Sequence, residues 1–311
     1  MAEPVAFLFP GQGAQAVGMG KDLCANFAVA RDTFAEADHV LGFPLSRLCF
    51  EGPLKDLTLT ANTQPALLTV SGATARVLDT ELGLRPHWAA GHSLGEFSAL
   101  VAAGALAFAD AVRIVRERGR AMQEAVAPGV GSMAALMGLD VATVEAVCAE
   151  AADGQVVSPA NLNGAGQVVI AGHREAVARA IALAQARGAK RAVPLTVSAP
   201  FHCALMAPAA ARLRVVLEPI QIAPLHCPVI SNVEARAYDD PGRAKDLLVR
   251  QVVSPVRWEE SVQELARLGC HAAVEVGQGR VLSGLVKRIA PSIRCAAGED
   301  LTAVRALVDS A

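Results

Sequence analysis

The sequence predicts an α/β protein in which a parallel sheet, covered by helices, is interrupted by a smaller inserted unit. The first observation is a repeated pattern. A short apolar run ends in a glycine loop at residues 5–13, 88–95 and 272–279. The second and third loops lead into apolar segments with helical spacing, and such strand–loop–helix repeats are typical of parallel sheets. Because ligands bind at the carboxyl ends of parallel strands, we expect all three glycine loops on that edge.

The second observation is a different order of elements in the middle of the chain. The predicted strands are residues 132–138, 155–158, 167–171 and 191–197, and the predicted helices are 141–152 and 174–187. This β-α-β-β-α-β order is that of a ferredoxin-like subdomain. Turn residues at 128–131 and 198–200 bracket it. We therefore expect an inserted subdomain at residues 129–197, a larger unit formed by residues 1–128 and 198–311, and a cleft between the two.

The composition narrows the class of protein. The 311 residues are 53% hydrophobic with a net charge of −2, which indicates a globular chain without a strongly basic surface for nucleic acid. No apolar run is long enough for a membrane span, and the first residues lack the basic start of a secretory signal. The seven cysteines form no CxxC pair, and the seven histidines show no ligand spacing. We therefore predict a cytoplasmic protein with reduced thiols and no metal site.

The second glycine loop, Gly91-His92-Ser93-Leu94-Gly95, has the spacing of a nucleophile elbow. A predicted strand, Trp88–Ala90, precedes it, and an apolar helix, Leu94–Leu106, is expected to follow. In that setting the Ser93 hydroxyl is exposed at a sharp turn, and the backbone N–H of Leu94 points at a developing oxyanion. The alternative is a tight turn with a structural serine.

Arg118 lies on the wrong face of its predicted helix. In the segment Asp110–Val126 the other charged side chains form one stripe, whereas Arg118 falls on the apolar stripe with Ala111 and Met122. Burying an unpaired charge is costly, so the guanidinium needs a partner. One interpretation is an internal salt bridge to a core carboxylate. The other is a fixed cation for a substrate that carries a carboxylate.

A serine nucleophile needs a base, most often histidine. His92 adjoins Ser93, and neighbours in a sharp turn usually point apart. His202 follows the break at residues 199–201 and opens the next predicted helix, which favours it as the base. The alternative is a capping or core histidine.

These features together resemble the family of malonyl-CoA:acyl-carrier-protein transacylases along nearly the whole chain. The matching segments are residues 9–15 (FPGQGAQ), 63–66 (TQPA), 91–96 (GHSLGE), 116–119 (RERG), 161–163 (NLN), 166–172 (GQVVIAG), 202–206 (HCALM) and 275–277 (EVG). Several motifs in the same order are far more specific than any one of them. The resemblance implies an α/β-hydrolase-like core with a ferredoxin-like insert.

The resemblance also implies roles for individual residues. Ser93 would be the nucleophile, His202 the base, and Arg118 the residue that holds the malonyl carboxylate. The backbone N–H groups of Gln12 and Leu94 would form the oxyanion hole, and the backbone carbonyl of Gln251 would orient the histidine. His92, Gln64 and Asn163 lie in matched segments and are expected at the substrate site. The residue before the base is Phe201, where many fatty-acid members of the family carry serine and malonyl-selective polyketide acyltransferases carry phenylalanine. The alternative for Phe201 is ordinary core filling.

The expected reaction moves a malonyl group from malonyl-CoA to the phosphopantetheine thiol of an acyl carrier protein through a malonyl-serine ester. It needs no metal or bound organic cofactor, and we expect a monomer. Fatty-acid and polyketide synthesis both remain open as the pathway. The rivals are a serine esterase or thioesterase, in which water takes the second step, and a non-catalytic docking module. Two basic pairs are candidate contacts for phosphate or carrier protein, with a solvated surface as the alternative: Lys190 with Arg191, and Lys287 with Arg288.

Overall fold

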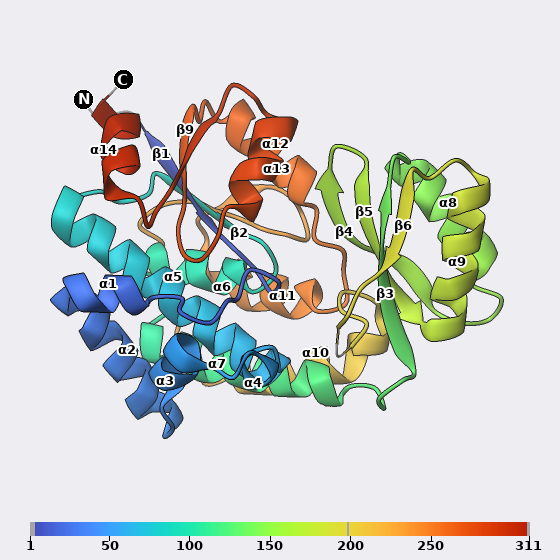
Figure 1. Cartoon of the computed structure of the whole chain (residues 1–311), viewed down its shortest axis with the longest axis horizontal. Coiled ribbons are helices and arrows are strands. Elements are labelled where there is room, and N and C mark those ends of the chain that lie inside the picture. Colours follow the sequence, from blue (N-terminus) through green and yellow to red (C-terminus); the bar gives the residue numbers. More distant parts are fainter. Residues whose placement is uncertain (1–3, 198, 310–311) are drawn as a thin grey trace.

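The computed structural model describes residues 4–197 and 199–309 and contains two sheets of different kinds (Figure 1). The larger sheet has the strand order β10 (Arg294–Ala297), β9 (Ala272–Glu275), β1 (Val5–Phe9), β2 (Trp88–Gly91), β7 (Val229–Ile230) and β8 (Ala237–Tyr238). Neighbouring strands are parallel from β10 to β7, and only the edge strand β8 is antiparallel. This is the parallel sheet that the strand–loop–helix repeats predict.

Helices cover both faces of the larger sheet. Side chains alternate along β1: Val5, Phe7 and Phe9 enter the main core, while Ala6 and Leu8 enter a second, smaller one. The helices of the main core are α1 (Lys21–Asn26), α2 (Ala28–Leu41), α3 (Leu45–Glu51), α4 (Leu54–Leu57), α5 (Thr60–Leu82), α6 (Gly95–Ala102), α7 (Phe108–Glu124), α10 (Ala207–Leu217), α11 (Pro241–Gln251) and α14 (Leu301–Asp309). On the other face, α12 (Trp258–Arg267) and α13 (Val281–Ile289) enclose the smaller core.

The smaller sheet belongs to the middle of the chain and lies to the side of the larger one (Figure 1). Its elements follow in the order β3 (Gly131–Met137), α8 (Val141–Ala151), β4 (Val157–Gly164), β5 (Gln167–His173), α9 (Arg174–Ala186) and β6 (Arg191–Pro194). The strands are antiparallel in the spatial order β4-β5-β3-β6, which is the ferredoxin-like topology. Helices α8 and α9 pack on one face, and the other face joins the main core through Met133, Ala135 and Ala171.

Three expected boundaries are wrong. Strand β4 continues beyond Ser158 to Gly164, although proline and asparagine are poor strand formers. It tolerates them because it is an edge strand whose pairing shifts register after Pro159 and again after Leu162. Strand β6 ends at Pro194, so residues 195–197 leave the sheet.

The third boundary is the end of α6, at Ala102 instead of Leu106. Gly104 adopts a left-handed conformation (φ 73°), and the N–H groups of Ala105 and Leu106 both donate to the Leu100 carbonyl. That closure ends the helix although the sequence stays apolar. Within residues 4–197 and 199–309, no helix combines the length and apolar character needed to cross a membrane.

Candidate active site

Two of the three glycine loops meet at Ser93. Strands β9, β1 and β2 are adjacent and parallel, so the loops that follow them lie on one edge of the sheet, as predicted. The loop after β1 brings Gln12 to the cavity that Ser93 lines. The loop after β9 instead lines a neighbouring hollow, with Gly277 beside Gly18 and Gly20.

Ser93 sits in the strained turn that a nucleophile elbow requires. Its backbone is left-handed (φ 53°), and its N–H donates to Asn232 Oδ1 at 2.7 Å. A Cβ on Gly91 would lie 1.9 Å from the carbonyl carbon of Gly95, and one on Gly95 would lie 2.1 Å from the carbonyl oxygen of Phe9. Only glycine fits either position, so the two glycines hold the turn against the end of β1.

Two residues that line the same cavity have backbone N–H groups without a partner among the described residues. Gln12 and Leu94 both line it, and neither N–H donates a hydrogen bond to a residue that the structure describes. Leu94 is the N-cap of α6, where the helix dipole favours negative charge. Both groups therefore satisfy the chemistry expected of an oxyanion hole.

His202 contacts Ser93 as the sequence predicts. Its Nε2 lies 2.8 Å from Ser93 Oγ, and its Nδ1 lies 2.8 Å from the backbone carbonyl oxygen of Gln251. A carbonyl only accepts, so Nδ1 carries the proton and Nε2 is free to accept one from the serine. Burial, together with the charge of Arg118, lowers the pKa of His202 to about 3. The imidazole is therefore neutral at physiological pH and able to act as a base.

Arg118 is buried without a salt bridge, so the internal ion pair considered above is wrong for the described residues. Its Nη1 donates to Gln64 Oε1 at 2.9 Å, and its Nη2 donates to Gln251 Oε1 at 2.8 Å and to Ser93 Oγ at 3.1 Å. Its Nε has no partner among the residues that the structure describes. Burial lowers the pKa of Arg118 to about 10, so the guanidinium stays charged at neutral pH. It is held by neutral oxygens, which leaves its charge uncompensated by any direct contact.

Glu96 and Asn232 complete a network that sequence reasoning did not assign. Glu96 Oε2 accepts from Gln251 Nε2 at 2.7 Å and from the Asn232 N–H at 3.2 Å, while its Oε1 has no partner. Burial raises the pKa of Glu96 to about 7, although these hydrogen bonds and Arg118 oppose the shift. Glu96 lies in residues 91–96, one of the segments that carry the family resemblance, so the sequence could have identified it as a site residue. Asn232 follows a two-residue strand, and nothing in the sequence marks it.

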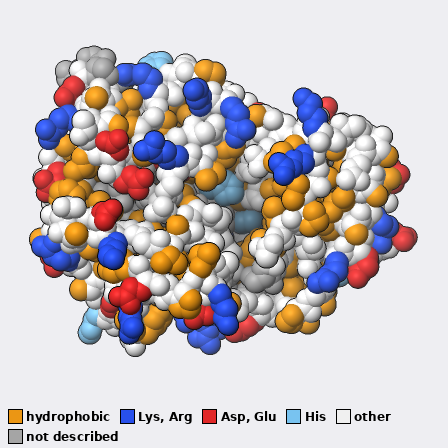
Figure 2. Space-filling model, in the orientation of Figure 1, with side chains coloured by type: hydrophobic (Ala, Val, Ile, Leu, Met, Phe, Trp, Pro, Cys, Tyr) orange, Lys and Arg blue, Asp and Glu red, His pale blue; other side chains and the backbone are white. Residues whose placement is uncertain are grey.

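The cavity above Ser93 measures about 300 Å³ and is lined by both structural units. Figure 2 shows a hollow between them with histidine side chains at its base. The inserted sheet contributes Met133 and Asn161, and the residues after β6 contribute Leu195, Thr196 and Val197. The larger unit contributes the remaining lining residues, among them Gln12, Gln64, His92, Ser93, Leu94, Arg118, Phe201 and His202.

Of the expected substrate residues His92 and Asn163, only His92 lines this cavity. The Nε2 atom of His92 lies 3.0 Å from Asn163 Oδ1. Asn163 itself is not among the lining residues, whereas Asn161 is. Asn163 therefore supports His92, and Asn161 is the asparagine of this strand that faces the cavity.

The four basic candidates lie outside the cavity. Arg191 is exposed at the start of β6, and Lys287 and Arg288 are exposed in the last turn of α13. Lys190 is exposed as well, with the stem of its side chain against Gly138. Figure 2 shows Lys and Arg side chains on the surface around the hollow. Any contact of these residues with a ligand therefore occurs outside the catalytic cavity.

A serine in a nucleophile elbow, paired with a neutral histidine and facing two free N–H groups, defines an enzyme of acyl-group chemistry. Residues 6–294 match the family model described as the acyl transferase domain, and the chain belongs to this family. The malonyl CoA-acyl carrier protein transacylase of Escherichia coli (strain K12) is 51% identical over 304 residues, which cover 98% of each chain.

Solved structures of similar proteins superpose on this chain over nearly its whole length. An acyl carrier protein S-malonyltransferase from Vibrio cholerae is 49% identical, with a TM-score of 0.94 over 97% of this chain and 100% of that one. A malonyl-transacylase solved in complex with its holo type II polyketide acyl-carrier protein is 47% identical. Its TM-score is 0.96 over 99% of this chain and 100% of that one.

The lowered pKa of His202 leads to a first prediction. A histidine in an unfolded chain titrates near pH 6.5, but His202 should stay neutral from about pH 5 to pH 8, because desolvation disfavours its charged form. Nitrogen chemical shifts of the ring, assigned with His202→Gln, should show a proton on Nδ1 throughout this range. Titration of that ring near pH 6.5 would contradict the geometry described here.

Proposed function

We propose that this chain transfers a malonyl group from malonyl-CoA to the phosphopantetheine thiol of an acyl carrier protein, through a malonyl ester of Ser93. One observation carries the proposal: Ser93 Oγ lies within hydrogen-bond distance of both His202 Nε2 and Arg118 Nη2. A base and a fixed cation thus meet at one nucleophile. The relatives named as malonyl transacylases support the same reaction.

In the first half-reaction His202 Nε2 takes the proton of the Ser93 hydroxyl as Oγ attacks the thioester carbonyl. The oxyanion that forms accepts hydrogen bonds from the N–H groups of Gln12 and Leu94. When the intermediate collapses, the carbon–sulfur bond breaks and His202 gives its proton to the departing CoA sulfur. The carbonyl of Gln251 holds the imidazole in place during both transfers.

The second half-reaction reverses these steps with a different thiol. The phosphopantetheine thiol gives its proton to His202 and attacks the ester carbonyl. The same two N–H groups stabilise the oxyanion, the ester bond to Ser93 breaks, and Oγ regains its proton from His202. The products are the malonyl thioester of the carrier protein and the free enzyme.

Arg118 would select an acyl group with a carboxylate. Its Nη1 and Nη2 donate to the neutral side-chain oxygens of Gln64 and Gln251, and its Nε donates to no residue that the structure describes. A malonyl carboxylate adds the negative charge that these contacts lack. The rival reaction, hydrolysis by a serine esterase or thioesterase, is less well supported, because a neutral acyl chain would leave the buried cation uncompensated.

We place the inserted subdomain at residues 129–197, between a catalytic unit of residues 1–128 and 198–311, since both units line the cavity. We propose that a monomer is active, because every residue in the described network comes from one chain. We propose a cytoplasmic location, supported by seven cysteines without a disulfide.

The reaction is tested by following the acyl group. Malonyl-CoA should add one malonyl group to the intact chain, visible by mass spectrometry, and Ser93→Ala should take up none. His202→Ala should acylate roughly 100-fold more slowly, the usual scale for a general base. Addition of a holo carrier protein should yield malonyl-carrier protein in excess over free malonate. Release of the group mainly as malonate would favour the hydrolase instead.

Glu96 should make malonyl selectivity depend on pH. Its pKa is raised to about 7, so the carboxyl is protonated below that pH and ionised above it. When Glu96 is ionised, its negative charge partly offsets the positive charge of Arg118. Arg118 then binds the carboxylate of the substrate more weakly. The ratio of kcat/KM for malonyl-CoA to that for acetyl-CoA should therefore fall roughly 10-fold from pH 6 to pH 8. This corresponds to an interaction of about one pKa unit between Glu96 and the substrate carboxylate.

The matched control for this pH dependence is Glu96→Gln, which keeps an oxygen that can accept from Gln251 but cannot ionise. Its malonyl-to-acetyl ratio should be flat with pH, and acetyl-CoA corrects for titration of the CoA itself. A flat ratio in the wild type, or a slope that survives in the variant, would show that Glu96 does not act on Arg118.

Phe201 should discriminate against a branched acyl group. The ring lines the cavity beside His202 and is 8% exposed, so a methyl on the α-carbon would crowd it. Overpacking costs about 1–3 kcal/mol, which predicts roughly 10- to 200-fold preference for malonyl-CoA over methylmalonyl-CoA. Phe201→Ser should narrow that preference in competition assays. A large loss of thermal stability with an unchanged ratio would identify the ring as core filling.

A further inference from the structure

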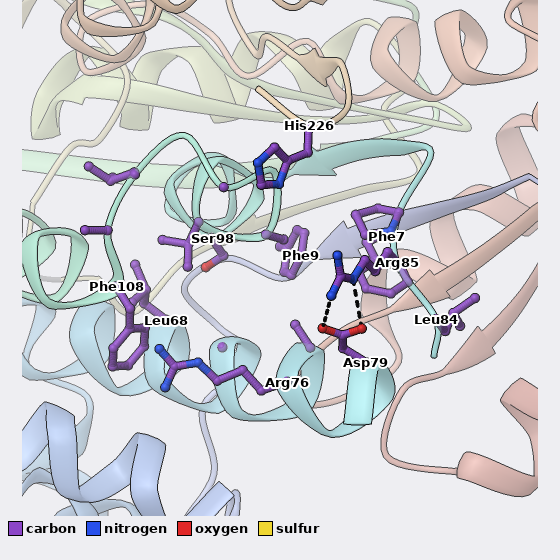
Figure 3. Close-up of a pocket in the computed structure, with 18 residues that line it drawn as sticks. Phe7, Phe9, Leu68, Arg76, Asp79, Leu84, Arg85, Ser98, Phe108 and His226 are labelled. Atoms are coloured by element: carbon purple, nitrogen blue, oxygen red, sulfur yellow. Dashed lines mark hydrogen bonds and ion pairs between the residues drawn. The ribbon is translucent and has the colours of Figure 1, made fainter. Parts of the chain in front are cut away.

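A second cavity, of about 420 Å³, lies beside α6 and shares no lining residue with the cavity at Ser93 (Figure 3). It is bordered by α5, α6, the start of α7 and the strand β1, and it opens to solvent beside Arg85. Its body is apolar, with aromatic rings from Phe7, Phe9 and Phe108 and the side chain of Leu68. A volume of this size is within the ~300–1,000 Å³ that small-molecule sites occupy.

Ser98 brings an unsatisfied hydroxyl to this apolar space. The residue is only 4% exposed, and its Oγ has no hydrogen-bond partner among the described residues. Figure 3 shows the oxygen directed among the lining side chains rather than back to its own helix. Buried hydroxyls are nearly always bonded, so a donor left free in a cavity points to a ligand that accepts from it.

Arg76 adds a second donor at the same cavity. Its Nη1 donates to Thr33 and Glu36, and its guanidinium lies over the Phe108 ring, 4.7 Å from the centroid. Its other nitrogens donate to no residue that the structure describes. By contrast, the nearby Arg85 is satisfied by a bidentate pair with Asp79, seen at the other end of the cavity in Figure 3.

We propose that this cavity binds a straight-chain monocarboxylate of medium length, such as an eight-carbon fatty acid. Its carboxylate accepts from Ser98 Oγ and from the unengaged nitrogens of Arg76. Its hydrocarbon chain packs against Phe7, Phe9, Leu68 and Phe108. A carboxylate only accepts hydrogen bonds, and both groups proposed to contact it, the Ser98 hydroxyl and the Arg76 guanidinium, can donate one.

The position of Ser98 connects this site to acyl transfer, a step of the argument that rests on the proposed function. The first turn of α6 carries Glu96, which bonds Gln251; Phe97, whose ring lies under Arg118; and Ser98. Gln251 Nε2 donates at 2.7 Å to Glu96 Oε2 in this turn and at 2.9 Å to the carbonyl oxygen of Ser93. A ligand that displaces the turn therefore lengthens these hydrogen bonds, and occupancy of the cavity lowers the rate of Ser93 acylation.

Binding is tested first, by calorimetric titration of the full chain with sodium octanoate. One octanoate per chain is expected. Ala75→Phe places a ring in the cavity from a half-buried position on α5 and should abolish binding, whereas Ala211→Phe, at an exposed site on α10, should not change it. Ser98→Ala should weaken binding about 10-fold. Equal binding by the wild type, Ala75→Phe and Ser98→Ala would overturn the site.

Two further arms test the headgroup and the coupling. Octan-1-ol, with the same chain and no charge, should bind about 10-fold more weakly than octanoate; equal affinity would overturn the carboxylate assignment. Saturating octanoate should slow acylation of Ser93 by malonyl-CoA in the wild type and leave Ala75→Phe unaffected. An unchanged wild-type rate would overturn the coupling. If the chain transfers no malonyl group at all, the proposed function fails, while the binding arms still decide whether the site exists.

Discussion

Gln251 is the residue on which the geometry of the site depends. Its backbone carbonyl orients His202, its side-chain oxygen accepts from Arg118, and its side-chain nitrogen donates to both Glu96 and the carbonyl of Ser93. One residue at the end of α11 thus fixes the base, the cation and the nucleophile's backbone relative to one another. A buried network in which most members are satisfied has one preferred arrangement, so the site is organised before substrate arrives.

The buried charge of Arg118 explains much of the chemistry around it. A guanidinium in the core is tolerated only with several partners, and here the direct partners are neutral oxygens. Among the described residues, the one carboxyl close enough to affect the pKa of Arg118 is that of Glu96, and it accepts a hydrogen bond from Gln251 and none from the arginine. The resting site therefore keeps positive potential at Ser93. That potential also disfavours protonation of His202, which keeps its imidazole neutral.

The sequence predicts the residues that follow backbone rules and misses those defined by tertiary contact. Ser93 is predictable because a left-handed turn between strand and helix requires glycines at fixed spacing. Arg118 is predictable because its helix has a clear apolar stripe. Asn232 accepts a hydrogen bond from the Ser93 N–H although the two residues are 139 positions apart in the sequence, and no spacing rule connects them. The length of β4 is missed for a similar reason: its proline and its two asparagines are tolerated only because the strand lies at a sheet edge.

Helix α6 links the sheet edge to the interior of the protein. Its N-terminus presents the Leu94 N–H to the catalytic cavity, and Gly91 and Gly95 leave no space between the helix start and the end of β1. The same strand sends Phe7 and Phe9 into the second cavity, and Phe9 accepts the N–H of His92 through its carbonyl. Contact this close transmits displacement, because packed interiors have little free volume to absorb it. The Ser93 turn is thus packed directly against the strand whose Phe7 and Phe9 line the second cavity.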